Sequence, residues 1–218
     1  MLLVHSGLSG VGRTLAVMDH ALDGLVDAVE AGAVELADEM LRRSGAVCPP
    51  TVHLLFKHLP QPYIASVTTR PFRRGSDAAA AVAALGLLPS VVHATRLIVV
   101  WEYSDLCAAL DLPDWREGRY PLGLVVVDAD LAEHVVHWHP FRMRTDAASD
   151  PAVPIPVTAS IWPEWGAEVR HPGGDLPASV AELLAVWREL RRGDVAATRA
   201  ELEAAGFVVN WVSDLARR

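Results

Sequence analysis

Cysteine and basic residues are both scarce in this chain of 218 residues. The two cysteines, Cys48 and Cys107, lie far apart in the sequence. They indicate no disulfide framework and are interpreted as small buried hydrophobic residues. The net charge is −8, and the basic clusters are short and scattered. Because nucleic-acid binding needs a basic face, this charge argues against nucleic acid as the main partner.

Long apolar runs are missing as well. No stretch approaches the roughly 18 to 20 apolar residues that a membrane-spanning helix needs. The first ten residues lack the basic start and the length of a signal peptide. We therefore expect a soluble, cytoplasmic protein with no membrane partner. The hydrophobic content of 51% nevertheless predicts a large buried core and excludes a disordered chain.

The order of the apolar patterns predicts an α/β (α+β) fold, with a mixed, largely antiparallel central sheet flanked by helices. Apolar residues at helical spacing predict a long N-terminal helix over residues 14–43, whose acidic residues, Glu30 among them, are expected to be solvated. Consecutive strand pairs argue against a strictly alternating parallel sheet. We expect one domain over residues 1–218, made of an N-terminal turn and long helix (1–45), a sheet core (51–170) and a C-terminal helical pair plus strand (177–218).

The remaining elements follow from apolar stretches between turn signals. Continuous apolar character favours a central position for the strand 96–102. Pro89 is expected to end a helix, and Ser104 or Asp105 to cap the next one. The predicted strands cover residues 51–59, 63–69, 96–102, 122–131, 134–141, 157–162 and 207–212, and the predicted helices cover 78–88, 104–110, 178–192 and 194–205.

The hairpin over residues 122–141 is the most strand-like stretch and holds three of the nine histidines. A two-residue turn at Ala132–Glu133 would place Asp128 opposite His137. Alternation with a period of two then sorts apolar side chains to one face and polar side chains to the other. The polar face would carry Asp128, Asp130, His137 and His139.

Two imidazoles two residues apart on a strand can ligate one metal ion, with a carboxylate completing the site. Asp128 or Asp130 could supply that carboxylate beside His137 and His139, and zinc is the cofactor we would expect. The alternative interpretation is that this face is the solvated side of the hairpin. Asp128 and His137 would then form a cross-strand pair.

The motif His137-Trp-His139-Pro140, followed by Asp150, is similar to the H-x-H-P…D motif of the JAB/MPN (JAMM) zinc isopeptidases. The resemblance implies zinc ligands at His137, His139 and Asp150. It also implies an upstream glutamate as general base, for which Glu102 at a strand end is the candidate. Ala147 stands where the family has its serine.

A glycine-rich stretch near the N-terminus has the spacing G-x4-G-R-T, formed by Gly7, Gly12, Arg13 and Thr14. This spacing resembles the phosphate-binding loop of P-loop nucleotidases, in which backbone N–H groups wrap a phosphate. Arg13 stands where that motif has lysine. The alternative is a tight turn ahead of the long helix.

No part of the sequence forms a complete catalytic motif, so whether the protein is an enzyme stays open. We therefore expect an interaction or assembly protein, whose long helix and tryptophans serve self-association or a protein partner. The first alternative is a metal-dependent (zinc) hydrolase centred on His137 and His139. The second is a degenerate P-loop nucleotide-binding protein.

Overall fold

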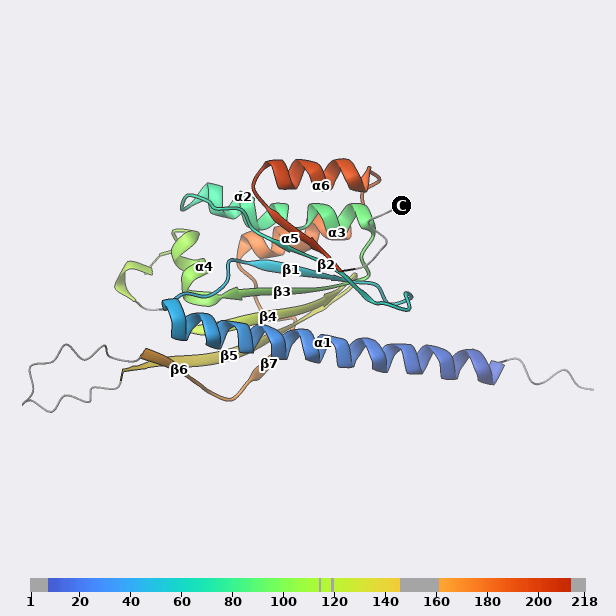
Figure 1. Cartoon of the computed structure of the whole chain (residues 1–218), viewed down its shortest axis with the longest axis horizontal. Helices are drawn as coiled ribbons and strands as arrows, with labels where there is room; N and C mark the ends of the chain where they lie inside the picture. The colour runs from blue at the N-terminus through green and yellow to red at the C-terminus, as the bar shows by residue number, and fades with distance from the viewer. Residues whose placement is uncertain (1–7, 114, 119, 146–160, 213–218) are drawn as a thin grey trace, which may run out of the picture.

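A computed structural model describes residues 8–113, 115–118, 120–145 and 161–212, without the side chains of residues 8–21, 115, 145 and 161. In these residues an eight-stranded sheet has α1 on one face and a group of helices on the other (Figure 1). Every strand pair is antiparallel. The predicted fold class, an antiparallel sheet flanked by helices with a long N-terminal helix, is confirmed.

The strand order is β6-β5-β4-β3-β1-β2-β8, and β7 pairs with β5 alongside β6. β3 is therefore central, as its apolar sequence predicts, and six of its seven residues are buried. The strands are β1 (Thr51–Leu55), β2 (Tyr63–Thr68), β3 (Arg96–Glu102), β4 (Gly123–Asp130), β5 (His134–Thr145), β6 (Ile161–Trp165), β7 (Val169–Pro172) and β8 (Val208–Trp211).

The larger core lies on the face that α2, α3, α5 and α6 cover (Figure 1). Trp101, Leu183 and Trp187 are among its fully buried side chains, and burial of a large apolar side chain contributes roughly 1.5 to 3 kcal/mol. Besides α1, the helices are α2 (Ser76–Ala84), α3 (Leu87–Val92), α4 (Tyr103–Ala109), a short 3₁₀ helix (Trp115–Glu117), α5 (Ala178–Arg188) and α6 (Val195–Ala204).

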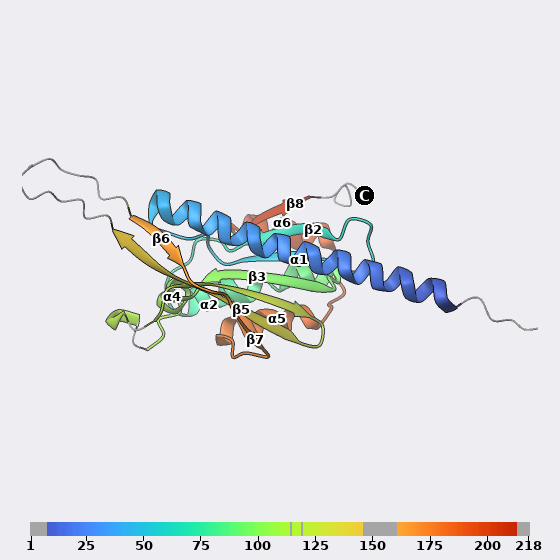
Figure 2. The ribbon, with the colours of Figure 1, turned by 90° about the horizontal axis from the view of Figure 1, so that it is seen from below.

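The opposite face of the sheet is crossed obliquely by α1 (Leu8–Ser44), whose N-terminal turns extend beyond the sheet (Figure 2). The helix starts six residues earlier than predicted and continues through Gly24 and Gly32. Its apolar stripe forms a second core with the sheet, so this stripe is used within the molecule. The buried members of that core are Leu22, Val26, Ala37, Leu55, Ile98, Val100, Leu124 and Val126.

The helix predicted over residues 78–88 is two helices. α2 ends at Ala84 and α3 begins at Leu87, so the prediction that Pro89 ends a helix is wrong. Pro89 lies in the first turn of α3, where its missing N–H removes no helical hydrogen bond.

The turn of the β4–β5 hairpin is one residue earlier than predicted. Asp130 pairs with Glu133 through a backbone hydrogen bond, which leaves Leu131–Ala132 as the loop. The Asp130 carboxylate accepts hydrogen bonds from the N–H groups of Ala132 at 2.7 Å and Glu133 at 2.8 Å. An aspartate that binds its own turn in this way fixes the turn position.

Two edge strands, β6 and β7, were not predicted with these bounds. The expected strand over residues 157–162 falls mostly outside the described residues, whereas β6 runs from Ile161 to Trp165 and contains Pro163. β7 is exposed along its whole length. Proline and exposed residues are tolerated at a sheet edge and hide the strand pattern. Among the described residues, no helix has both the length and the hydropathy needed to cross a bilayer.

Candidate metal centre

Glu30 lies on the side of α1 that faces the sheet. It is one turn after Val26 and two turns before Ala37, and both of these residues belong to the buried stripe. Residues three and four apart share a helix face, so the helix places this carboxylate among apolar contacts. Glu30 is only 5% exposed. The expectation that it is solvated is therefore wrong, and a buried carboxylate requires polar partners.

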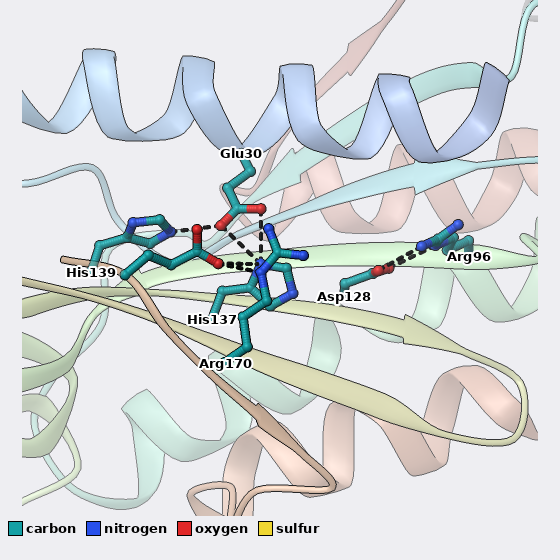
Figure 3. A network of polar contacts seen from close by, with 7 residues as sticks. Glu30, Arg96, Asp128, His137, His139 and Arg170 are labelled. Atoms are coloured by element: carbon teal, nitrogen blue, oxygen red, sulfur yellow. Dashed lines mark hydrogen bonds and ion pairs between the residues drawn. The ribbon is translucent and has the colours of Figure 1, made fainter. Parts of the chain in front are cut away.

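The partners of Glu30 are the two imidazoles of β5 (Figure 3). Nδ1 of His137 is 2.8 Å from both carboxylate oxygens, and Nε2 of His139 is 2.7 Å from Oε1. Because a carboxylate only accepts hydrogen bonds, each of these ring nitrogens carries a hydrogen and donates it. The polar face of the hairpin is therefore covered by α1, and the interpretation as a solvated face is wrong for His137 and His139.

The charge of this cluster is set by opposing effects on Glu30. Burial alone would raise the pKa of its carboxyl, but the hydrogen bonds from His137 and His139 outweigh burial and lower the pKa from 4.5 to about 2. Glu30 is therefore ionised at neutral pH, directly beside two groups that can ligate a cation.

A second carboxylate approaches from the segment between β6 and β7. Oε1 of Glu168 is 3.5 Å from Nδ1 of His137. Nε of Arg170 donates to the same oxygen at 2.5 Å, and this hydrogen bond raises the pKa of Arg170. Arg170 lies directly opposite His137 in the β5–β7 ladder. The Glu168 side chain is 31% exposed, so the cluster reaches solvent on this side.

Ligand atoms of Glu30, His137 and Glu168 all lie within 4.8 Å of one another. His139 adds a second imidazole through its contact with Glu30. Imidazole nitrogens and carboxylate oxygens are the ligands that zinc-type ions take in proteins. With neutral imidazoles, as metal binding requires, two carboxylates and the guanidinium of Arg170 leave one net negative charge, which favours a bound cation.

Asp128, predicted to face His137, has a different partner. In the hairpin register Asp128 pairs with Val135, and His137 pairs with Val126. The observed register differs from the predicted register by two residues. An even difference leaves each polar residue on the same face of the hairpin but gives it a different cross-strand neighbour. The expected Asp128–His137 pair is therefore wrong.

A guanidinium holds the Asp128 carboxylate instead. Nε and Nη2 of Arg96 donate to its two oxygens at 2.7 and 2.6 Å, as Figure 3 shows. Arg96 also reaches Asp23 of α1 at 2.8 Å. Together these contacts form a second polar link between α1 and the sheet.

Glu102, the predicted general base, is the N-cap of α4. Its buried carboxylate accepts hydrogen bonds from the backbone N–H groups of Asp105 at 2.5 Å and Gly123 at 3.2 Å. The expectation that Ser104 or Asp105 caps this helix is therefore wrong. Leu124 pairs with Glu102 on one side and with His139 on the other. The strand β3, which carries Glu102, is thus two strand spacings, about 10 Å, from β5, which carries His139.

The remaining predicted site residues are Asp150, Gly7, Gly12, Arg13 and Thr14. Asp150 and Gly7 fall outside the described residues. Gly12, Arg13 and Thr14 lie inside α1, where the backbone is helical. This placement does not provide the loop on which the nucleotide-binding prediction rests.

The chain matches no protein-family model, no curated protein and no solved structure at a significant level. The resemblance to the JAMM isopeptidases therefore rests on the motif from His137 to Asp150. Glu30, Glu168 and Arg170, which lie around His137 and His139, are not part of that motif.

Sequence reasoning missed Glu30, although the sequence holds a signal for it. The stripe Leu22, Val26, Ala37 and Leu41 has helical spacing, and Glu30 occupies a position within that spacing. An acidic residue on an apolar helix face indicates a buried partner. No comparable signal was available for Glu168, because its position depends on the pairing of β6 and β7 with β5.

Proposed function

We propose that the protein binds a divalent metal ion of the zinc type between α1 and β5. Glu30, His137 and Glu168, whose ligand atoms lie within 4.8 Å of one another, are the proposed ligands, and His139 joins them through its contact with Glu30. The observation that carries the proposal is the convergence of the buried, ionised Glu30 with His137 and Glu168, beside the second imidazole of His139.

The donor set favours zinc-type ions over calcium or magnesium. Calcium takes six to eight oxygen ligands and magnesium keeps an octahedral shell of oxygens, largely water. Two imidazoles instead suit zinc and its neighbours. Ligand atoms around a tetrahedral zinc ion stand about 3.3 Å apart, given bonds of about 2.0 to 2.1 Å. The present separations of 2.7 and 2.8 Å around Glu30 would have to widen by about half an ångström. His139, which lies outside the group of converging ligand atoms, would have to turn toward the ion.

The bound ion would fasten α1 to the sheet. Glu30 comes from the first helix, whereas His137 and His139 come from a strand more than 100 residues later. An ion that binds only when these elements meet stabilises the folded state by its binding free energy. The burial of Glu30 and His137 supports this structural role.

Metal-dependent hydrolysis is the second candidate, and the partial exposure of Glu168 favours it. A catalytic zinc ion needs a coordination position open to water. The solvent-reaching side of Glu168 would border that position. Glu168, which is 3.5 Å from His137, would be the carboxylate nearest to a bound water.

The prediction of an interaction or assembly role stays a prediction. Leu22 is 3% exposed and packs on the sheet. A polar substitution at Leu22 would therefore disturb this core, so its effect on self-association could not be separated from its effect on the fold.

The metal proposal is tested on full-length protein that has been treated with a chelator and dialysed. Isothermal titration with Zn²⁺ should give about one ion per chain, with a rise in Tm that Mg²⁺ does not reproduce. The double substitution His137→Ala and His139→Ala should abolish both signals. His171→Ala, at an exposed histidine of β7, is the matched control and should bind like the wild type. Equal zinc binding by the double variant would refute the proposal, and so would the absence of any binding to the wild type.

A further inference from the structure

A cavity of about 400 Å³ lies between α1, the loop over residues 47–49 and the sheet, where β1 and β2 contribute most of the lining. It is on the flank of α1 opposite to β5, because the strand order places β5 and β2 on different sides of β3. Its volume falls in the range of small-molecule sites in proteins. The cavity shares no residue with the cluster of Glu30, His137 and His139.

The wall that α1 contributes is apolar, and most of its side chains are small. Val29, Gly32, Ala33, Leu36 and Ala37 line the cavity on this side. A glycine inside a helix costs about 1 kcal/mol relative to alanine. A Cβ added at Gly32 would meet no atom within 4 Å, so packing against neighbours does not require glycine there. Gly32 is exposed and lies at the rim of the cavity.

The wall that the sheet contributes carries hydrogen-bonding groups. Nδ1 of His53 and the hydroxyl of Tyr63 are 2.8 Å apart, and the hydroxyls of Thr51 and Thr68 are 3.0 Å apart. The Tyr63 hydroxyl also has a hydrogen bond with the Ser66 side chain. Because a hydroxyl has one donor and two lone pairs, one position is left for another partner. This wall can therefore bind one polar group of a ligand.

The described residues that line the cavity include no charged side chain, and His53 is the one histidine among them. Burial lowers the pKa of His53 to about 4, so its ring is neutral at physiological pH. A charged ligand would lose its hydration without gaining a countercharge, which is costly. Nucleotides, carboxylates and amines are thus disfavoured, whereas an uncharged apolar molecule is suited to both walls.

We infer that this cavity binds a neutral, largely apolar small molecule with a hydroxyl or carbonyl group directed at His53 and Tyr63. The inference is independent of the metal proposal, because different residues carry it.

Two fluorescent probes test the inference on the full-length protein. N-phenyl-1-naphthylamine is neutral, and 8-anilino-1-naphthalenesulfonate has the same aromatic frame with a negative charge. The neutral probe should bind saturably at one site, at least tenfold more tightly than the anion. Equal binding of the two probes would overturn the inference, as would a lack of saturable binding by the neutral one.

A pair of glycine variants locates the probe. Gly32→Leu should cover the rim of the cavity and weaken binding of the neutral probe at least tenfold. Gly24→Leu is the matched control, because it lies on the same helix, has no atom within 4 Å of an added Cβ and does not line the cavity. Its affinity should equal that of the wild type. Equal affinity in both variants would contradict the proposed location.

Amide chemical shifts of the wild-type protein give a test that needs no variant. Addition of the neutral probe should shift the signals of Ser66 and Thr68, which line the cavity. A second cavity lies on the opposite face and is lined by Trp101 and Trp138. Shifts at those tryptophans, with none at Ser66 and Thr68, would overturn the inference.

Discussion

Glu30 of α1 and His137 of β5, 107 residues apart in the chain, are joined by two contacts of 2.8 Å from one imidazole nitrogen to both carboxylate oxygens. Both side chains are buried. Their pairing fixes how α1 lies on the sheet, because neither group can be left in this core without the other. The same pairing brings together the ligand atoms of the proposed metal centre.

Acid should remove the stabilisation that Glu30 provides. The pKa of its carboxyl is about 2 in the folded protein against 4.5 for the free side chain. A lowered pKa stabilises the fold above the unfolded value, and this stabilisation disappears as the pH falls from about 4.5 toward 2. Glu30→Gln should therefore lower the free energy of unfolding by about 3 kcal/mol at neutral pH, and the difference should shrink toward zero near pH 2.

Urea unfolding in the presence of a chelator, at a series of pH values, measures this difference. Glu39→Gln, at an exposed glutamate of the same helix, is the control and should change stability by less than about 0.5 kcal/mol. A Glu30→Gln difference that stays constant from pH 7 to pH 3 would contradict the assignment.

Arg96 should be far more important for stability than an exposed arginine. It binds both oxygens of Asp128, whose side chain is 13% exposed, and its loss would leave that carboxylate nearly buried and unpaired. We expect Arg96→Met to cost about 3 kcal/mol in urea unfolding. Arg43→Met, at a surface pair with Glu39, should cost less than about 0.5 kcal/mol. Replacing Asp128 by Leu in the Arg96→Met background should recover part of the loss, and no recovery would argue against an unpaired carboxylate as its cause.

The two side-chain N-caps of α4 and α6 should differ in strength. Asp194 accepts a hydrogen bond from the N–H of Ala197 at an exposed position, so Asp194→Ala should cost about 1 kcal/mol. Glu102 is buried and holds two backbone N–H groups, so Glu102→Ala should cost about 2 to 3 kcal/mol. Guanidinium unfolding compares the two, and equal losses would show that the Gly123 contact contributes little.

Gly123 should tolerate no side chain, since a Cβ there would overlap the Trp138 ring. Gly123→Ala should lower the free energy of unfolding by about 2 kcal/mol or more and change the near-UV circular dichroism of Trp138. Gly24→Ala in α1 meets open space and should stabilise the protein by up to about 1 kcal/mol. A Gly123→Ala variant with wild-type stability and spectrum would refute the close contact.

The fold could be predicted from sequence wherever one element carried its own pattern. The apolar run of β3 gave its central position, and alternation in the β4–β5 hairpin gave the correct face for His137 and His139. The predicted face was correct although the predicted turn position was wrong, because the register error was two residues and an even error leaves each side chain on the same face. The exposed edge strand β7 carries no such pattern, so its position and that of Arg170 could not be predicted.

The candidate site could be predicted only in its strand half. His137 and His139 follow from local spacing, whereas their carboxylate partner depends on which helix covers the sheet. Asp128 was the nearest acidic residue in the predicted register, but a guanidinium two strands from β5 binds it instead. Partners that come from distant elements are decided by tertiary packing, which single-sequence patterns do not encode.

X-ray absorption at the zinc edge of the zinc-loaded protein tests the central claim most directly. Coordination by Glu30, His137 and Glu168, with His139 beside them, predicts nitrogen and oxygen neighbours at about 2.0 to 2.1 Å, together with the outer-shell scattering of two imidazoles, and a loss of this spectrum in the His137→Ala, His139→Ala variant. Sulfur neighbours at about 2.3 Å would instead indicate Cys48 or Cys107. That result, or an unchanged spectrum in the variant, would contradict the metal centre.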